Sequence, residues 1–401
     1  MIAKRLSHQL SNYWEVSMSN KVPQIRFNGY SDDWEERKLG EVYKFQYGQF
    51  NNNPDNGGQY PIYGANGIIG GYNEYNAENS IIIGHMGAYA GHVLWGDGRH
   101  FVTYNGTIGL ENKKILDAQF GYYLTLSVDI PRLTAGSGQP FVSYSDLNGI
   151  KIVIPNLDEQ QKIGSFFKQL DDTIALHQRK LDLLKEQKKG YLQKMFPKNG
   201  AKVPELRFAG FADDWEERKL GTIYDFGKGK GLPLDSFIYS SNNPAIAYGH
   251  LYTKYSEVIS EVFWSSNDNG VLSKDNDLLF PGSSTVPNGT AQANAITLNN
   301  VKLGGDIIIG RPKKGVGVLS TFMSYQVNSQ RQKLFPITVG TTITHMYGKD
   351  ISKLNFFITD YSEQEKIASF FKQLDDTIAL HQRKLDLLKE QKKGLLQKMF
   401  V

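Results

Sequence analysis

The sequence predicts an α+β protein in which two mixed α/β modules are joined by two long helices, paired within the chain as an antiparallel coiled coil. Two repeats support this: residues 161–196 return at 365–400 with three substitutions, and residues 22–40 return at 203–221. The segments between the repeats hardly align. They consist of short β-branched and aromatic stretches broken by Gly and Asn. This order of shared and diverged segments indicates a pseudo-twofold internal repeat.

Composition narrows the class of protein. A chain of 401 residues, of which 40% are hydrophobic, is long enough for two globular units. The absence of Cys excludes disulfides and thiolate chemistry, and it agrees with a reducing cytoplasm, where we expect the protein to act. The longest apolar runs, at 81–83 and 307–309, are far shorter than a membrane span, so we expect no membrane association.

The repeats also predict the domain boundaries. The N-terminal extension begins with basic residues, but Ser, His, Gln and Asn interrupt the apolar stretch that a signal peptide would need, so we expect it to be dispensable. The two repeats keep the frame of the chain, whereas the segments between them have changed. We expect an extension at 1–20, a first module at 21–157, a first helix at 158–197, a second module at 198–361 and a second helix at 362–401.

The two helices carry the pattern of a coiled-coil seam, in which apolar positions follow alternating steps of four and three residues. About thirty residues at roughly 1.5 Å each predict a rod of about 45 Å. Capping-box spacing places the helix starts at Asp158 with Gln161 and at Ser362 with Glu365. The predicted seam residues are Ile163, Phe167, Leu170, Ile174, His177, Leu181 and Leu184 in the first helix and Ile367, Phe371, Leu374, Ile378, His381, Leu385 and Leu388 in the second.

Two histidines, His177 and His381, interrupt the apolar seam. They are either a pH-sensitive or metal-binding pair or polar residues that fix the register of the coil. We favour the register, because no carboxylate or further His completes a set of metal ligands, and we predict no metal site.

A second apolar stripe runs beside each seam. Such a stripe is most often core against the flanking module, and docking of a partner helix is the alternative. Its members are Phe166, Leu176 and Leu183 in the first helix and Phe370, Leu380 and Leu387 in the second.

The modules have the texture of short strands joined by tight turns, with helical pieces at 115–128 and 320–335. They contain YPIYGANGIIGGY, IIIGHMGAYAG and AIAYGHLYT, and the loop GSGQPFVSYSDL followed by IPNLDEQQKI. Taken in this order with the repeats, these stretches resemble the specificity subunit of type I restriction-modification systems, and the resemblance covers nearly the whole chain from about Met18.

The resemblance implies a function in DNA restriction and methylation. In that family two target-recognition domains each read one half of a bipartite double-stranded DNA site, the helices set the spacing, and two methyltransferase (modification) subunits dock around them. The implied protein is a non-catalytic subunit of a complex with restriction and translocase subunits. No cofactor is implied in this chain, because S-adenosylmethionine, ATP and Mg²⁺ are used by the partner subunits. The identical helices would then be a ruler and docking frame.

Two other functions compete with this reading. Asp55 and Glu111, with Lys113, form a loose pattern of a Mg²⁺-dependent restriction nuclease, although the gap between them is long. A purely structural coiled-coil protein that binds no nucleic acid is the third possibility. The stretch GKGKGL at 227–232 lacks the Gly-Lys-Ser/Thr ending of a phosphate-binding loop, and we interpret it as a turn carrying two cations.

Residues that read DNA are expected among the loops of the modules. The net charge of +4 is a weak indication, and residues 41–150 contain five basic and nine acidic residues, so binding would depend on placed side chains or on a partner. Base edges are read by polar side chains, and phosphates are held by cations. The DNA-binding candidates are Tyr63, Asn66, His85, Arg99, Ser137 and Gln139 in the first module and Lys228, Lys230, Tyr248, His250, Arg311, Lys313, Lys314, Thr341, Thr342 and His345 in the second.

Overall fold

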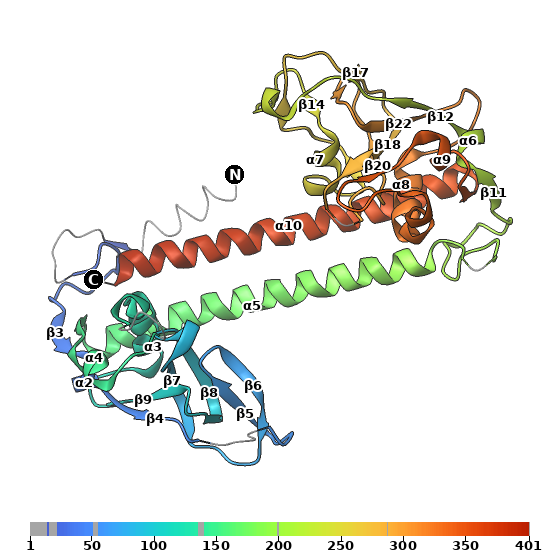
Figure 1. Ribbon diagram of the computed structural model, residues 1–401. Coiled ribbons are helices and arrows are strands. Elements are labelled where there is room, and N and C mark those ends of the chain that lie inside the picture. Colours follow the sequence, from blue (N-terminus) through green and yellow to red (C-terminus); the bar gives the residue numbers. More distant parts are fainter. Residues whose placement is uncertain are drawn as a thin grey trace. The chain divides into compact units, whose positions relative to one another are not determined.

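The chain forms two compact units, each of which contains one module and part of both long helices (Figure 1). Unit 1 comprises residues 1–178 and 383–401, and unit 2 comprises residues 179–382. The computed structural model describes residues 22–50, 55–134, 140–198, 200–286 and 288–400, together with the backbone of 14–15. In these ranges no helix combines the length and apolar character needed to cross a membrane.

The module of unit 1 is built on a sheet with the strand order β4-β9-β7-β8-β5-β6, antiparallel except between β5 and β8. Strand β7 carries Ile81–Ile83, which are buried because both of its faces are covered: Ile81 and Ile83 pack in one apolar cluster and Ile82 in another. The elements are β1 (Trp14–Glu15), β2 (Arg26–Phe27), β3 (Glu35–Lys38), α2 (Leu39–Val42), β4 (Tyr43–Tyr47), β5 (Tyr60–Gly64), β6 (Gly67–Tyr72), β7 (Ala77–Gly84), η1 (Gly87–Tyr89), β8 (Val93–Val102), β9 (Gly106–Glu111), α3 (Ala118–Ser127), η2 (Ile130–Leu133), α4 (Tyr144–Gly149) and β10 (Lys151–Ile154).

The module of unit 2 has a sheet with the order β12-β22-β18-β20-β15 and a smaller sheet, β14-β21-β17. The elements are β11 (Glu216–Lys219), α6 (Leu220–Ile223), β12 (Tyr224–Lys228), η3 (Leu234–Ser236), β13 (Ile238–Tyr239), β14 (Ala245–Ile246), α7 (Tyr248–Thr253), β15 (Val258–Ile259), β16 (Trp264–Ser265), β17 (Val271–Leu272), β18 (Asp277–Pro281), β19 (Ser283–Ser284), β20 (Asn294–Ile296), β21 (Lys302–Leu303), β22 (Ile307–Pro312), α8 (Ser320–Ser329), η4 (Arg331–Lys333), η5 (Phe335–Ile337), β23 (Thr344–His345), α9 (Gly348–Ile351) and β24 (Asn355–Ile358).

The long helices are α5 (Leu157–Lys194) and α10 (Tyr361–Met399). At 1.5 Å per residue, the 38 residues of α5 span about 57 Å, so the predicted rod of about 45 Å was too short. The predicted capping residues were also wrong. Asn156 accepts the backbone N–H of Glu159, and Asp360 accepts that of Ser362, so each helix begins earlier than its Asp158 or Ser362.

The two helices run antiparallel within each unit. In unit 1 Lys392 lies 2.6 Å from Asp171, and in unit 2 Lys188 lies 2.6 Å from Asp375. The predicted seam residues are all buried or half-buried, which confirms the seam.

Within each unit this register places the seam histidine level with a carboxylate of the other long helix. In unit 1 His177 lies six residues after Asp171 on α5, and Asp386 lies six residues before Lys392 on the antiparallel α10, so the two are at the same level. The same steps from Lys188 and Asp375 lead to Asp182 and His381 in unit 2. Over the described residues, no group of three His, Asp or Glu side chains could hold a metal ion.

Candidate DNA interface

In unit 1 the residues that follow β7 form hydrogen bonds with the loop that precedes α4. The Val142 N–H donates to the His85 carbonyl at 3.0 Å, the Gly87 N–H donates to the Pro140 carbonyl at 2.8 Å, and Met86 forms a β-bridge with Phe141. The stretches IIIGHMGAYAG and GSGQPFVSYSDL, which lie far apart in the sequence, therefore meet where β7 ends. We call this end of the sheet the edge of unit 1.

Aromatic rings fill this edge of unit 1. Tyr47, at the end of β4, stacks on Tyr144 at 4.1 Å and contacts His85 at 4.2 Å. Tyr104 and Phe141 surround His85 and remain about two-fifths exposed. The edge thus presents flat apolar surfaces to solvent, and rings of this kind can stack on nucleic-acid bases or contact thymine methyl groups.

The matching edge of unit 2 is polar. There β19 pairs with β23, so that Ser283 faces His345, and their Oγ and Nδ1 atoms lie 3.0 Å apart. Asp306 accepts a hydrogen bond from Ser283 at 3.2 Å and forms an ion pair with Lys228 at 2.7 Å. The lysine lowers the pKa of Asp306, and the Ser283 hydroxyl contributes to the same shift. The two units therefore use one backbone arrangement to present different chemistry.

A glycine after the first strand of each sheet makes this arrangement possible. A Cβ at Gly48, after β4, would collide with the carbonyl oxygen of Thr103, and one at Gly229, after β12, would collide with that of Gly304. The glycines in YGQ and KGK are thus needed for close backbone approach. The stretch GKGKGL, predicted as a turn, instead begins in β12 with Gly227 and Lys228 and continues as irregular backbone, and Lys228 and Lys230 are both exposed.

Several predicted DNA-binding residues are exposed. Asn66 lies in the turn between β5 and β6, and Thr341 and Thr342 lie in the loop before β23. Arg99 is exposed on β8, where its guanidinium stands over the Tyr75 ring at 4.8 Å and lies 3.7 Å from Glu78. Ser137 and Gln139 lie outside the described residues.

Three predicted residues are buried and serve the core instead. His85 is 6% exposed, and its Nδ1 lies 3.1 Å from the Val142 carbonyl. His250 is 9% exposed, stacks on Trp264 and accepts the Ala247 N–H, and burial lowers its pKa. Tyr63 is equally buried, whereas Tyr248 is half-buried at the start of α7. These three side chains therefore offer little exposed surface for contact with DNA.

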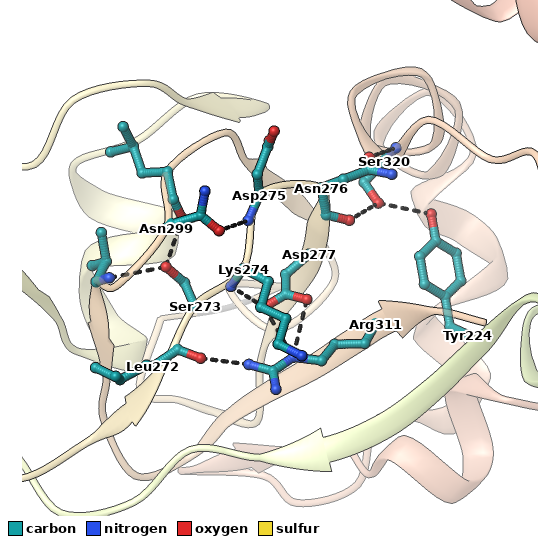
Figure 2. A network of polar contacts seen from close by, with 12 residues as sticks. Tyr224, Leu272, Ser273, Lys274, Asp275, Asn276, Asp277, Asn299, Arg311 and Ser320 are labelled. Atoms are coloured by element: carbon teal, nitrogen blue, oxygen red, sulfur yellow. Dashed lines mark hydrogen bonds and ion pairs between the residues drawn. The ribbon is translucent and has the colours of Figure 1, made fainter. Parts of the chain in front are cut away.

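Arg311 belongs to an internal polar network rather than to a free basic cluster (Figure 2). Its Nε lies 3.2 Å from the buried carboxylate of Asp277, and its other end donates to the Leu272 carbonyl. Asp277 also accepts the Lys274 backbone N–H at 2.8 Å, and burial raises its pKa despite these contacts. The arginine neutralises a buried charge, which accounts for its position.

The rest of the predicted cluster is divided. Lys313 donates to the Gly221 carbonyl at 2.7 Å, whereas Lys314 is exposed. Lys314 lines a groove of about 590 Å³ together with Lys228 and Lys274, and Asp225 and Asp275 line it as well.

The nuclease alternative is not supported by the geometry of unit 1. Asp55 accepts the N–H groups of Gly57 and Gly71 beside β6, and these hydrogen bonds lower its pKa. Glu111 ends β9, four strand positions away in the sheet, or about 19 Å at 4.8 Å per strand. The two carboxylates therefore cannot share a metal ion.

Sequence reasoning missed the contacts that fasten the repeats together. Arg26 forms a bidentate ion pair with Glu159 at 2.6 and 2.7 Å, and Arg207 forms the same pair with Glu363 at 2.7 and 2.8 Å. Gln160, at the start of α5, accepts the Asp117 N–H at 2.8 Å. The signal was available, because these residues recur in both repeats without belonging to the apolar seam.

Comparison with known proteins agrees with this architecture. The type I restriction modification DNA specificity domain matches residues 31–186 and 212–390. The MjaVIII specificity subunit of a type I restriction enzyme from Methanocaldococcus jannaschii is 22% identical over 91% of each chain. The putative type I specificity subunit S.MpnORF507P of Mycoplasma pneumoniae is 30% identical over 33% of this chain and 38% of its own.

A solved structure has the same fold. The S subunit of a type I restriction-modification system from M. genitalium superimposes with a TM-score of 0.71 at 16% identity, covering 95% of this chain and 99% of that one. The predicted fold class, with two mixed α/β modules and two long packed helices, is thereby confirmed. Because the specificity domain matches most of both repeats, the chain belongs to the family of type I restriction-modification specificity subunits, the non-catalytic subunits for DNA target recognition.

Proposed function

We propose that this chain recognises a bipartite DNA target, with one half read by the module of each unit. One observation carries the proposal: the edges described above share a backbone arrangement, yet unit 1 fills it with aromatic rings and unit 2 with Lys228, Asp306 and His345. Different side chains on one scaffold are what two independent sequence preferences require.

In unit 1 the proposed surface consists of exposed side chains around the buried His85. Tyr104 and Phe141 supply ring surfaces, and Gln49 and Asn105 supply amide groups that can read base edges. Asn66, in the turn between β5 and β6, and Arg99, on β8, are also exposed and complete the proposed set. Ser137 and Gln139 precede Phe141 in the sequence and stay predictions from the sequence.

In unit 2 the proposed base-reading residues are Thr341 and Thr342, whose loop is held by the hydrogen bonds between Val339 and His345. The lysines that line the groove beside Arg311 are suited to phosphates, and Lys230 lies close to them in the chain. Because Asp225 and Asp275 line the same groove, we expect weak binding by the isolated chain and tighter, salt-dependent binding with a partner.

The proposed partners are two modification subunits, which bind the exposed leucines of the long helices. Leu176 and Leu387 are 66% and 52% exposed at the same level of unit 1, and Leu183 and Leu380 are 52% and 64% exposed at the same level of unit 2. Leucines outside the seam that the modules do not cover form a typical contact surface for another protein. Phe166, in contrast, packs on Phe27 within unit 1, so only part of the stripe contacts its module.

The remaining components belong to the partners in this proposal. S-adenosylmethionine would serve the modification subunits, ATP and Mg²⁺ would serve restriction and translocase subunits, and the complex would act on DNA in the cytoplasm. This chain would supply target choice and spacing.

Exchange of one module tests the proposal. Residues 41–150 are replaced by the corresponding segment of another specificity subunit, and methylated sites are mapped by sequencing the genome of cells that carry the complex. We expect one half of the target to change and the other to remain. The matched exchange of residues 222–350 should change the opposite half. Simultaneous loss of both halves in either chimaera would contradict independent modules.

Docking is tested by stoichiometry. We expect Leu176→Ser with Leu387→Ser to reduce the number of bound modification subunits from two to one, measured by native mass spectrometry. Leu133→Ser, which changes an exposed leucine of the module, is the control. Two bound subunits in the double variant would contradict this docking surface.

A further inference from the structure

A polar contact joins the module of unit 1 to both long helices at one point. The Tyr123 hydroxyl, from α3, donates to Asp171 of α5 at 2.8 Å. Lys392 of α10 lies 2.6 Å from the same carboxylate, and its ammonium stands 5.3 Å from the centre of the Tyr123 ring. Three elements from distant parts of the sequence therefore meet at Asp171.

Unit 2 contains the same contact. The Tyr325 hydroxyl, from α8, donates to Asp375 of α10 at 2.7 Å. Lys188 of α5 lies 2.6 Å from Asp375 and 5.5 Å from the centre of the Tyr325 ring. Unit 2 adds Glu257, whose carboxylate lies 2.8 Å from Lys188. We call each set of Tyr, Asp and Lys a latch.

The latch combines groups of different origin. The aspartates and lysines occur in the identical helices, whereas the tyrosines occur in modules that have diverged almost everywhere else. Each tyrosine follows a buried Phe by three residues: Phe120 contacts Phe400, and Phe322 contacts Phe196. The Phe-x-x-Tyr pattern is thus a feature that both modules present to the frame.

A backbone clasp lies about three helical turns before the aspartate of each latch on the same long helix. Gln160 of α5 accepts the Asp117 N–H at 2.8 Å and donates to the Ile115 carbonyl, and in unit 2 Gln364 accepts the Leu319 N–H at 2.9 Å and donates to the Gly317 carbonyl. These bonds go to backbone groups, so they tolerate any module sequence. The clasp, which is the pair of hydrogen bonds made by Gln160 or Gln364, positions the start of α3 or α8. The latch then holds that short helix in one orientation about its start.

The charge states suit this role. Burial raises the pKa of Tyr123 and of Tyr325, so both hydroxyls stay protonated donors near neutral pH. Burial alone would lower the pKa of Lys188, but Glu257 and Asp375 outweigh it and raise that pKa. A charged acceptor with two donors is held more rigidly than an apolar contact, because its hydrogen bonds are directional.

We propose that Tyr123 and Tyr325 are positioning residues that hold each module in one orientation on the helices and so restrict the spacer length that the protein accepts. This inference rests on the proposed bipartite recognition. Both tyrosine side chains are buried against the helices, so in this proposal they act on spacing and leave the choice of bases to the exposed edges.

The test uses the full chain in complex with its modification subunits. Binding is measured to duplexes that carry its own target with the natural spacer, or with the spacer shortened or lengthened by one base pair. We expect Tyr325→Phe and Lys188→Met to reduce discrimination between the natural and altered spacers about tenfold. Base preference in both half-sites should be unchanged. Tyr123→Phe probes the other unit if a unit 2 variant folds poorly.

The control is Lys185→Met, which changes an exposed lysine one turn from Lys188 on the same helix. Spacer discrimination in the tyrosine variants equal to that of the control would overturn the proposal. A uniform loss of affinity for all spacers would also overturn it, because it would show a role in stability alone. If the unaltered protein showed no spacer preference or read a single undivided site, the proposed bipartite function itself would fail.

Discussion

Replacing Arg26 by Met removes one partner of an ion pair that is almost fully enclosed. The side chains of Arg26 and Glu159 are 4% and 0% exposed, and two hydrogen bonds of 2.6 and 2.7 Å join them. The variant leaves the Glu159 carboxylate buried without its cation. Loss of one partner of a buried pair costs about 3–5 kcal/mol, much of a typical domain stability of about 5–15 kcal/mol.

Hydrogen exchange followed by mass spectrometry measures this effect unit by unit. We expect peptides of β7 and α3 in unit 1 to exchange about 10²- to 4 × 10³-fold faster in Arg26→Met, because a cost of about 3–5 kcal/mol lowers the free energy of opening. Peptides of unit 2 should be unaffected. Arg207→Met should give the opposite pattern, because Arg207 pairs with Glu363 in unit 2.

The control is an arginine whose ion pair is exposed. Arg132 lies 2.6 Å from Asp129, but the two side chains are 85% and 53% exposed, so Arg132→Met should cost about 0–1 kcal/mol. If Arg26→Met and Arg132→Met accelerate exchange equally, burial does not determine the strength of these pairs and the reasoning is wrong.

Three further predictions address spacing, pH and charge. Insertion of seven residues into both long helices keeps the seam in phase and lengthens each helix by about 10 Å, so the accepted spacer should grow by about three base pairs. A four-residue insertion should instead inactivate the protein. Activity of the seven-residue variant on the original spacer alone would contradict the role of the helices as a ruler. Burial lowers the pKa of His100 in the folded state, so as the pH falls below about 6.5 the unfolded chain binds a proton at His100 before the folded chain does, and unit 1 should lose stability. His100→Asn should flatten this pH dependence of the free energy of unfolding, measured with urea from pH 7 to 5. Lys314→Met, which removes an exposed lysine of the groove, should lower the slope of log binding constant against log salt by about one without changing base preference, and an unchanged slope would exclude a phosphate contact.

Periodicity predicted the long-range architecture well. The seam, the helices α3 and α8 and the strand-rich modules all follow from local patterns of apolar residues, which the burial of the side chains confirms. Burial of single polar residues could not be predicted in this way. His85, His250 and Arg311 have the residue types of DNA contacts, but their neighbours in space come from distant segments, so the sequence alone does not show that the two histidines are buried or that the half-buried Arg311 is held by Asp277.

Helix starts failed for a different reason. The spacing of Asp158 with Gln161 satisfies a capping box, but the structure uses Asn156, which lies just before the helix and accepts the Glu159 N–H. Local rules allowed both choices. Glu159 lies in the first turn in either case, so its bidentate pair with Arg26, which is 133 residues away, does not distinguish the two starts.

The frame and the modules tolerate change to different degrees, and the contacts explain why two nearly identical copies persist beside diverged ones. A substitution of Arg26, Glu159 or their counterparts leaves a buried group without its partner, so both residues must change together. The backbone contacts between the shorter repeat and the end of a long helix are also equivalent: the Ile25 N–H donates to the Lys398 carbonyl in unit 1, and the Leu206 N–H donates to the Lys194 carbonyl in unit 2. Exposed residues such as Thr341 carry no such constraint, since surface substitutions usually change stability by less than about 0.5 kcal/mol. Sequence preference can therefore diverge at the edges of the sheets while the frame that positions them cannot.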